Sequence, residues 1–492
     1  MDRIRAYTCY GARMKHTHYA TGLVLLTLLG LSVGCSEESV PTEVAYSEAD
    51  DLVKIGGKFD TGYYSSLAME LEGTFEGIIE LDVTALDDAE REELQDPTVL
   101  RLIAEDQVKM AKNQLNEKRL HLNLTAGEVL FDSQEVVERD GGTFLVAAFT
   151  VKAESLITYA ELEEVGINPL DLEDTSHEVT VPADPRYLLS RAGESCASGH
   201  AQGSLHEGNY FYYFEPTLET CLIPMSPAAA FHVHSLLSQE ETFPEYDRLT
   251  ADGRVDIAIV FGAYTSSEPP ESDWGVMMWR SYAADLRTSG WDEVPGLEVG
   301  QRYQRERAGL LELIDLYSPT DLYHHQDTDG TFAELLKTRE IIVYNGHSFY
   351  GSLNAMDDGA NYPQDTYQIL FMNSCWSYEY YTKQVFTHKA TEADPTGWND
   401  ADVINNTTYA YFPQMSTSTR KLMTNLLAGA EHGGEDDYGR RFSWQSIIGI
   451  MNDEARGVCP EDADPQDCRH YQPKNAHEIY GVSGVRTNVY TP

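Results

Sequence analysis

Basic residues are scarce in this sequence. Lysine and arginine together number 35 in 492 residues, against 80 aspartates and glutamates, so the formal net charge is −45. A protein with this excess of negative charge is repelled by the phosphates of nucleic acids and by anionic lipid surfaces. We therefore expect no nucleic-acid partner, and a charged surface that stays solvated, also in salty surroundings where ions screen the repulsion.

Long apolar runs are missing after the first 35 residues, where none approaches the roughly 20 residues that a membrane-spanning helix needs. The N-terminus differs, because Arg3, Arg5, Arg13 and Lys15 precede the apolar run 22–31. A basic segment, a short apolar segment and small residues make up a secretory signal. We expect residues 1–34 to be such a signal peptide.

The residues around Cys35 resemble the lipobox of bacterial lipoproteins, in which a cysteine after a small residue is acylated and becomes the first residue. Gly34 precedes Cys35, although Ser32 stands where the lipobox usually has leucine. The resemblance implies a lipid anchor at Cys35 in the bacterial cell envelope, and Ser36 implies the outer membrane. Residues 35–55 would be a flexible tether. The alternative is a plain signal peptide cleaved nearby.

The chain has only seven cysteines, and an exported chain would meet an oxidising compartment, where cysteines pair. Cys9 would leave with the signal peptide, and Cys35 would carry the lipid. Two pairs of neighbours are candidates for disulfides: Cys196 with Cys221, and Cys459 with Cys468. This pairing leaves Cys375, either as an inert buried residue or as a reactive thiol.

The length predicts two or three domains, because single hydrophobic cores stop growing near about 250–300 residues. Residues 56–225 have the composition of an α+β or mostly-β module. Within it, 75–83 and 143–151 have strand composition, and 96–116 has amphipathic helical spacing. Nothing in this module predicts chemistry, so we expect a prodomain or a spacer.

From residue 250 to 455, strand-like and helical segments alternate, which predicts an α/β domain whose mostly parallel sheet is covered on both faces. The expected strands are 255–261, 341–344, 367–372 and 402–411. The expected helices are 274–287, 303–317, 330–337, 376–386 and 416–427. Residues 456–492 would form a disulfide-containing C-terminal tail.

Two of the expected strands end in reactive residues. Strand 341–344 continues into Asn-Gly-His-Ser, which contains His347, and strand 367–372 continues into Asn-Ser-Cys, which ends in Cys375. If these strands are neighbours, His347 and Cys375 meet at one edge of the sheet, where functional residues of α/β folds collect. A thiolate can attack a carbonyl while an imidazole transfers protons and backbone N–H groups bind the oxyanion. A helix that begins after Cys375 would favour the thiolate.

A strand ending in Tyr-x-Gly-His, followed by a strand ending in a small residue and Cys, resembles the caspase-like cysteine peptidases (clan CD). Residues 334–348 are most similar to the gingipain branch, in which a helix, a strand and Gly-His-Gly occur in this order. The resemblance covers about residues 250–430. It implies a caspase-like three-layer fold and hydrolysis of peptide bonds in protein or peptide substrates, without a cofactor.

The same resemblance implies His347 as the catalytic imidazole and Cys375 as the nucleophile, in a dyad without an obligatory third carboxylate. It further implies that Gly346, Ser348 and the Cys375 amide shape the oxyanion pocket. Ser348 stands where the family commonly has glycine, and its Cβ constrains the backbone. The alternative function is therefore a catalytically inactive binding module of the same fold. Gingipains prefer Arg or Lys before the cleaved bond, but no matching pocket can be read from this sequence.

Two histidine pairs define a third option, a metal-dependent binding protein. His232 and His234 would point to one side of a strand. His324 and His325 precede an Asp-x-Asp-Gly segment that hints at a calcium loop, although a turn capping the next helix is favoured. No carboxylate or thiol partners stand at ligand spacing, so we expect no metal site.

Two further groups of polar and aromatic residues have both a functional and a structural interpretation. Three residues around strand 402–411 could line a substrate cleft or only shape a turn: Asp402, Asn405 and Asn406. Three tyrosines around Phe211 could bind glycans or cover a half-buried strand: Tyr210, Tyr212 and Tyr213.

Overall fold

The computed structural model describes residues 63–117, 120–123, 129–159, 162, 168–189, 193–197, 210–237, 241–265, 268–325, 328–349, 353–408, 410–455 and 479–492. The expected signal peptide, the tether, and Cys9, Cys35, Cys459 and Cys468 lie outside these residues. Among the described helices, none combines the length and apolar composition needed to cross a membrane.

The N-terminal unit is built on a six-stranded antiparallel sheet. Its longest strands are β2 (Ala68–Asp82) and β5 (Gly142–Thr158), which pair along nearly their whole length; β2 includes all but the last residue of the expected strand 75–83, and β5 contains the expected strand 143–151. The order is β3-β5-β2-β7-β6, and β4 pairs with β5. The shorter strands are β3 (His121–Asn123), β4 (Val129–Arg139), β6 (Ser176–Glu178) and β7 (Ala229–Leu237). Because β7 belongs to this sheet, the unit extends beyond the expected boundary at 225.

Along the two long strands, side chains that face the core of this unit alternate with side chains that face away from it. Leu71, Phe75 and Ile79 of β2 are fully buried, and the ring of Phe75 stacks against that of Phe149 in β5. Helix α3 (Pro97–Glu117) covers the sheet with its apolar side, in agreement with the expected helix 96–116. A shorter helix, α2 (Asp88–Leu94), precedes it.

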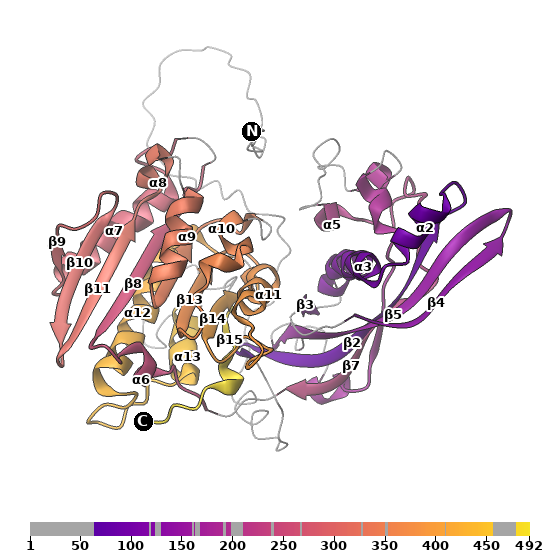
Figure 1. Ribbon diagram of the computed structural model, residues 1–492. Helices are drawn as coiled ribbons and strands as arrows, with labels where there is room; N and C mark the ends of the chain where they lie inside the picture. Colours follow the sequence, from indigo (N-terminus) through magenta and orange to yellow (C-terminus); the bar gives the residue numbers. More distant parts are fainter. Residues whose placement is uncertain are drawn as a thin grey trace, which may run out of the picture.

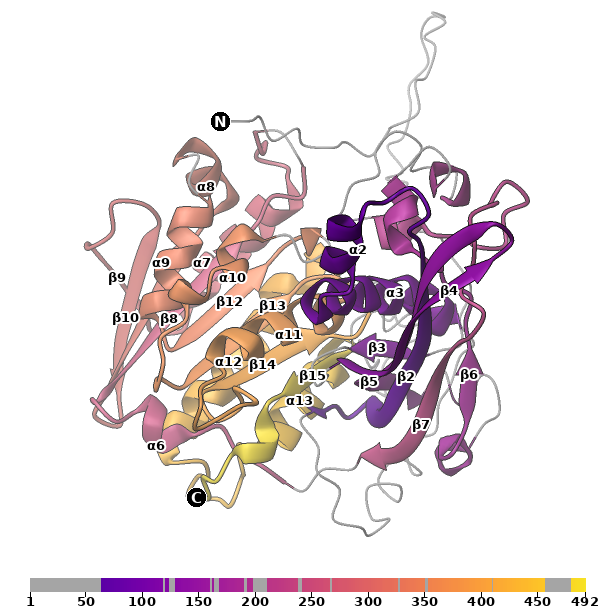
Figure 2. The same ribbon diagram turned by 45° about the vertical axis from the view of Figure 1, so that its right-hand side comes forward.

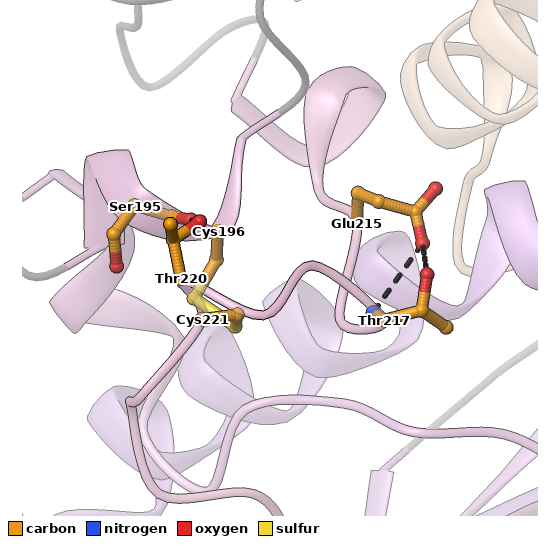
Figure 3. The surroundings of a disulfide bond; sticks show 6 residues. All are labelled: Ser195, Cys196, Glu215, Thr217, Thr220 and Cys221. Carbon is orange, nitrogen blue, oxygen red and sulfur yellow. Dashed lines mark hydrogen bonds between the residues drawn. A yellow bond between two sulfur atoms is a disulfide. The ribbon is translucent and has the colours of Figure 1, made fainter.

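The expected pairing of Cys196 with Cys221 is confirmed, and Figure 3 shows its surroundings. The bond joins residues 25 apart, with an S–S distance of 2.04 Å. Next to it, the hydroxyl of Thr220 donates a hydrogen bond of 2.6 Å to the carbonyl of Ser195. The disulfide therefore holds together two segments that have little regular structure.

The second unit contains a nine-stranded mixed sheet of order β1-β15-β14-β13-β12-β8-β11-β10-β9. Its five central strands are parallel: β8 (Arg254–Phe261), β11 (Leu310–Tyr317), β12 (Ile341–Asn345), β13 (Gln368–Asn373) and β14 (Ala401–Asn406). Each of the outer strands runs antiparallel to the strands beside it: β1 (Tyr63–Tyr64), β9 (Asp292–Val294), β10 (Gln301–Arg307) and β15 (Tyr480–Ser483). The α/β class expected for this region is confirmed.

Helices cover both faces of this sheet, as Figure 1 shows. One face carries α8 (Pro319–His325), α9 (Thr328–Thr338), α10 (Asn354–Asp357) and α11 (Ser377–Lys389). The other carries α6 (Tyr246–Leu249), α7 (Trp274–Thr288), α12 (Met415–His432) and α13 (Trp444–Ala455). Successive residues of β12 alternate between the two cores: Ile342 packs in one, and Ile341 and Val343 in the other. The near-continuous apolar strands follow from this burial on both faces.

The segment 303–317 is expected to be helical, and this expectation is wrong. It lies in the antiparallel hairpin of β10 and β11, where Arg307 pairs with Leu310 across a two-residue turn. Both turn residues, Ala308 and Gly309, have positive φ values of 52° and 82°, as a type I′ turn requires. The apolar residues of β11 fit a helical period as well as a strand period, which explains the error.

The sheet also includes two strands from outside the expected 250–455 domain. β15, from the expected C-terminal tail, pairs with β14, and β1 pairs with β15 in turn. Figure 2 shows the N-terminal unit beside this end of the sheet, with β3 near α11. Polar contacts join the units there: the Lys112 ammonium donates to the carbonyl of Glu379 (3.3 Å), and the hydroxyl of Tyr378 lies 3.3 Å from a carboxylate oxygen of Glu70.

Asp402 is the second residue of β14, at the opposite end of the strand from its carboxyl edge, and is fully buried. One carboxylate oxygen accepts hydrogen bonds from the Trp444 indole (2.8 Å), the Asn488 amide (2.8 Å) and the Tyr367 hydroxyl. Burial raises the pKa of Asp402 to about 7. Asp402 therefore ties the last residues of the chain to the sheet.

We expect Asp402 to make stability depend on pH. Because its folded-state pKa lies above the unfolded value of about 4, its contribution is complete below pH 4 and is lost as the pH rises through 7. Relative to Asp402→Asn, the wild-type free energy of unfolding should fall by up to about 4 kcal/mol across this window. Urea unfolding at several pH values measures the difference, and parallel pH profiles for the two proteins would contradict it.

Candidate functional site

The two candidate catalytic residues follow neighbouring strands. β12 and β13 are parallel, and the last residues of the two strands, Asn345 and Asn373, are paired in register. His347 stands two positions after Asn345, and Cys375 stands two positions after Asn373. The expectation that the strands are neighbours is confirmed, so both residues leave the same edge of the sheet at the same level.

Buried asparagines connect the ends of three adjacent strands. The Asn373 amide donates to the side-chain oxygen of Asn345 (2.8 Å), and the Asn406 amide donates to that of Asn373 (3.0 Å). All three are fully buried and are the last residues of β12, β13 and β14. We call Asn345, Asn373 and Asn406 the asparagine ladder. Ser418 and Thr419 of α12 complete it with hydrogen bonds of 3.1 and 3.0 Å.

Gly346 has a structural role that differs from the expected one. Its N–H donates to the carbonyl of Asn373 (3.2 Å), so in this conformation it is not available to an oxyanion. A Cβ at this position would lie 2.6 Å from the hydroxyl oxygen of Tyr344, which donates to the carbonyl of His347 (2.9 Å). The glycine therefore allows the Tyr344 hydroxyl to hold the turn that carries the imidazole.

The imidazole of His347 is oriented by a backbone carbonyl. Its Nε2 lies 3.0 Å from the carbonyl oxygen of Tyr264, in the loop after β8. Because a carbonyl only accepts, this bond assigns the proton to Nε2 and leaves Nδ1 as the basic nitrogen. The ring also contacts Phe412, with ring centroids 5.0 Å apart.

Asp273 holds Tyr264 in this position. Its two carboxylate oxygens accept hydrogen bonds from the N–H groups of Tyr264 (3.1 Å) and Thr265 (2.9 Å), and it also caps α7 through Gly275 (2.8 Å). Asp273 is buried. The sequence reasoning missed both Tyr264 and Asp273. The available signal was an aspartate directly before an expected helix, a usual N-cap residue.

Cys375 carries a thiol and is partly exposed. The N–H of Ala410 donates to its sulfur at 3.5 Å, so a loop after β14 contacts this thiol. The next residue, Trp376, is in the left-handed conformation with φ of 46° and precedes the first turn of α11. Such a conformation costs a non-glycine residue roughly 1–2 kcal/mol, and strain of this kind collects at functional sites.

Ser348 is buried, and its carbonyl accepts a hydrogen bond from the Tyr381 hydroxyl. Its φ is not among the positive values, so a serine fits here without strain. The left-handed residue is its neighbour, Phe349, with φ of 48°. Within the described part of the chain, no hydrogen bond uses the Ser348 N–H. The backbone geometry therefore removes the expected obstacle at Ser348 and leaves an N–H donor near the dyad.

The remaining polar candidates of β14 lie inside the protein. Asp402 is at the far end of the strand from His347 and Cys375, so it does not line this site. Asn405 donates to the Thr382 hydroxyl of α11 (2.9 Å) and is fully buried. Asn406 belongs to the asparagine ladder. These residues hold the strand and its helix in place; they neither line a cleft nor shape a turn.

The first histidine pair, His232 and His234, has ordinary partners. His232 lies 3.5 Å from a carboxylate oxygen of Glu76, and His234 lies 2.9 Å from the Thr74 hydroxyl. The side chains of His324 and His325, at the end of α8, and residues 326–327 lie outside the described part. No group of three or more metal-ligating side chains occurs among the described residues.

The expected tyrosine cluster forms the short helix α5 (Tyr210–Tyr213) rather than a strand. Phe211 is buried and Tyr213 partly buried, while the side chains of Tyr210 and Tyr212 lie outside the described part. The apolar side of α5 therefore belongs to the core of the N-terminal unit.

The edge after β12 and β13 thus carries a thiol, an imidazole with a defined basic nitrogen and a backbone N–H donor. This set can perform nucleophilic substitution at a carbonyl group. No protein-family model, curated protein or solved structure was found to match the chain.

We expect Asp273→Ser to release the imidazole without unfolding the protein. Serine can still cap α7, but a single hydroxyl cannot hold both Tyr264 and Thr265. Nitrogen-15 NMR should show one Nε2–H tautomer of His347 in the wild type and a mixture of tautomers in the variant. Asp87→Ser, the same change at the N-cap of α2, is the matched control. Unaltered His347 signals in Asp273→Ser would refute this role of Asp273.

We expect Asn373→Leu to destabilise the protein by at least about 2 kcal/mol, because it leaves the buried amides of Asn345 and Asn406 without their shared partner. Asn425→Leu is the control, since the Asn425 amide makes one hydrogen bond (2.8 Å) to the Lys421 carbonyl within α12. Urea unfolding of both variants tests this expectation. Equal losses in the free energy of unfolding would show that the asparagine ladder stabilises the protein no more than a single hydrogen bond within a helix.

Proposed function

We propose that this chain is a cysteine endopeptidase with a caspase-like α/β domain, in which His347 and Cys375 form the catalytic dyad. The observation that carries the proposal is the register of β12 and β13, which brings both residues to one edge two positions after the paired Asn345 and Asn373. The three layers, the central parallel strands and the site at their carboxyl ends agree with the motif resemblance.

The reaction begins when Nδ1 of His347 takes the proton of the Cys375 thiol. The thiolate attacks the carbonyl carbon of the peptide bond, and the resulting oxyanion accepts hydrogen bonds from the backbone N–H groups of Ser348 and Cys375. The C–N bond then breaks, and the leaving amine takes the proton from the imidazolium. Water, deprotonated by His347, hydrolyses the thioester and releases the carboxylate and the thiol.

The carbonyl of Tyr264 has the role that a carboxylate has in a triad. It fixes the tautomer of His347 and stabilises the imidazolium, because its hydrogen bond from Nε2–H becomes charge-assisted when Nδ1 is protonated. A carbonyl has no net charge, so it stabilises the imidazolium less than a carboxylate would. This agrees with a dyad that needs no third acidic residue.

The second candidate function is a catalytically inactive binding module with the same fold. One observation favours it. The sulfur of Cys375 accepts a hydrogen bond from the N–H of Ala410, and Nε2 of His347 is hydrogen-bonded to the carbonyl of Tyr264. Neither hydrogen bond connects His347 with Cys375. Catalytic hydrogen bonds are often loose before substrate is bound. The distinction therefore depends on the reactivity of the thiol.

For the rest of the chain, we propose a lipid anchor on Cys35 in the bacterial outer membrane. The N-terminal unit would serve as a prodomain or spacer. Its contacts with α11, through Lys112 and Glu70, support a role in holding the helix that follows Cys375.

We expect iodoacetamide to alkylate Cys375 at neutral pH about tenfold faster than an unactivated thiol, and His347→Ala to remove this advantage. The full-length protein is used, and mass spectrometry identifies the labelled residue. Cleavage of a quenched peptide mixture should disappear in Cys375→Ala and His347→Ala. Slow labelling that ignores His347, together with no cleavage, would refute the peptidase and leave the binding module.

A further inference from the structure

Three aromatic side chains near the dyad are unusually exposed. Tyr264, Phe349 and Tyr411 are 42%, 51% and 42% exposed. They belong to three different loops, which follow β8, β12 and β14 at the carboxyl edge of the parallel strands. We call these three residues the aromatic rim.

Ring contacts place two residues of the aromatic rim, Tyr264 and Phe349, beside the imidazole. The His347 centroid lies 5.9 Å from that of Tyr264 and 6.0 Å from that of Phe349. The buried ring of Phe412 lies beneath, 5.0 Å from His347 and 5.2 Å from Tyr264. The rings of Tyr264, Phe349 and Phe412 therefore form one aromatic cluster with the imidazole.

The third rim residue is linked to the nucleophile. The N–H of Ala410 donates to the sulfur of Cys375 at 3.5 Å, and Tyr411 is the next residue along the chain. The loop 410–412 thus contacts Cys375 through Ala410 and His347 through Phe412. A peptide whose carbonyl carbon reaches the thiol must place its neighbouring side chains against this loop.

The backbone under the rim is held in place before any ligand arrives. Asp273 fixes the N–H groups of Tyr264 and Thr265, and Phe349 is in the left-handed conformation. Aromatic side chains on an ordered backbone have little entropy to lose when an apolar group covers them. Their exposure is therefore a source of binding free energy for apolar side chains.

Asp273, the carboxylate that holds the Tyr264 loop, is not arranged to recognise a basic side chain. Asp273 is buried, and both of its carboxylate oxygens already accept hydrogen bonds from backbone N–H groups. An aspartate so engaged cannot form the bidentate ion pair that selects arginine. Long-range attraction by the net charge of −45 would still favour basic peptides, but that attraction is screened by salt.

We propose that the aromatic rim selects peptides with aromatic or large aliphatic side chains beside the reacting bond, rather than Arg, Lys or Asp. This rests on the proposed function, because a peptide carbonyl must lie at Cys375. The side chain would pack against the rings of Tyr264 and Tyr411, with Phe412 below. The same surface would serve an inactive binding module, so its selectivity can be measured separately from catalysis.

The test measures binding to the full-length Cys375→Ala variant, which cannot cleave. Fluorescent peptides of equal length carry one Phe, Leu, Lys, Arg or Asp, moved through the central positions of a Gly/Ser background. Phe and Leu peptides should bind at least about tenfold more tightly than Lys and Asp peptides, the effect of one buried apolar side chain. This ratio should persist from about 0.05 to 0.5 M salt, because apolar contacts are not screened.

Tyr264→Ala and Tyr411→Ala, each added to Cys375→Ala, should lower the preference for Phe severalfold; Tyr264→Ala keeps the backbone carbonyl that orients His347. The control is Tyr438→Ala, an exposed tyrosine beyond the far end of α12, roughly 27 Å of helix away from the site. Near-UV circular dichroism checks that each variant is folded. A preference that both rim variants retain would overturn the proposal.

Cleavage of the same peptides by the wild type separates the two proposals. Cleavage only after Lys or Arg would overturn the aromatic preference and keep the peptidase. Basic peptides that bind best, with strong salt dependence, would also overturn the aromatic preference. Binding that prefers Phe without any cleavage would overturn the peptidase and keep the rim. Failure of every peptide to bind would overturn the aromatic preference.

Discussion

The asparagine ladder is the constraint on which the site depends. Three parallel strands end at one level because Asn345, Asn373 and Asn406 share buried hydrogen bonds. A shift of one residue in any strand would break these bonds and would also turn every side chain of that strand to the other face. The positions of His347 and Cys375, each two residues farther on, follow from this register.

The candidate site is built from backbone groups as much as from side chains. The carbonyl of Tyr264 orients the imidazole, the N–H of Ala410 contacts the sulfur, and the N–H of Ser348 makes no hydrogen bond within the described part of the chain. Backbone groups keep their polarity whatever side chain they carry. They are also held by neighbouring structure: Asp273 fixes one loop, and left-handed turns at Phe349 and Trp376 fix two others.

Much of the second unit's sheet and of the candidate site could be predicted from the sequence. Apolar runs predicted β8, β12 and β13, and the residues after two of them predicted that His347 and Cys375 share an edge. Tyr264 and Asp273 could not be predicted as partners of His347, because a contact across about 80 residues through a carbonyl leaves no motif. The hairpin of β10 and β11 was missed because its apolar residues fit both periods. β15 was missed because a four-residue strand carries little pattern.

The contacts between the two units affect what happens when the N-terminal unit is removed. β15 is covered at the sheet edge by β1, and Glu379 and Tyr378 of α11 meet Lys112 and Glu70 of the N-terminal unit. A chain trimmed to its second unit would present β15 as an open strand edge, which invites aggregation by edge-to-edge pairing. The strand β1, which lies before the N-terminal unit in the chain, is therefore needed to cover the sheet of the second unit.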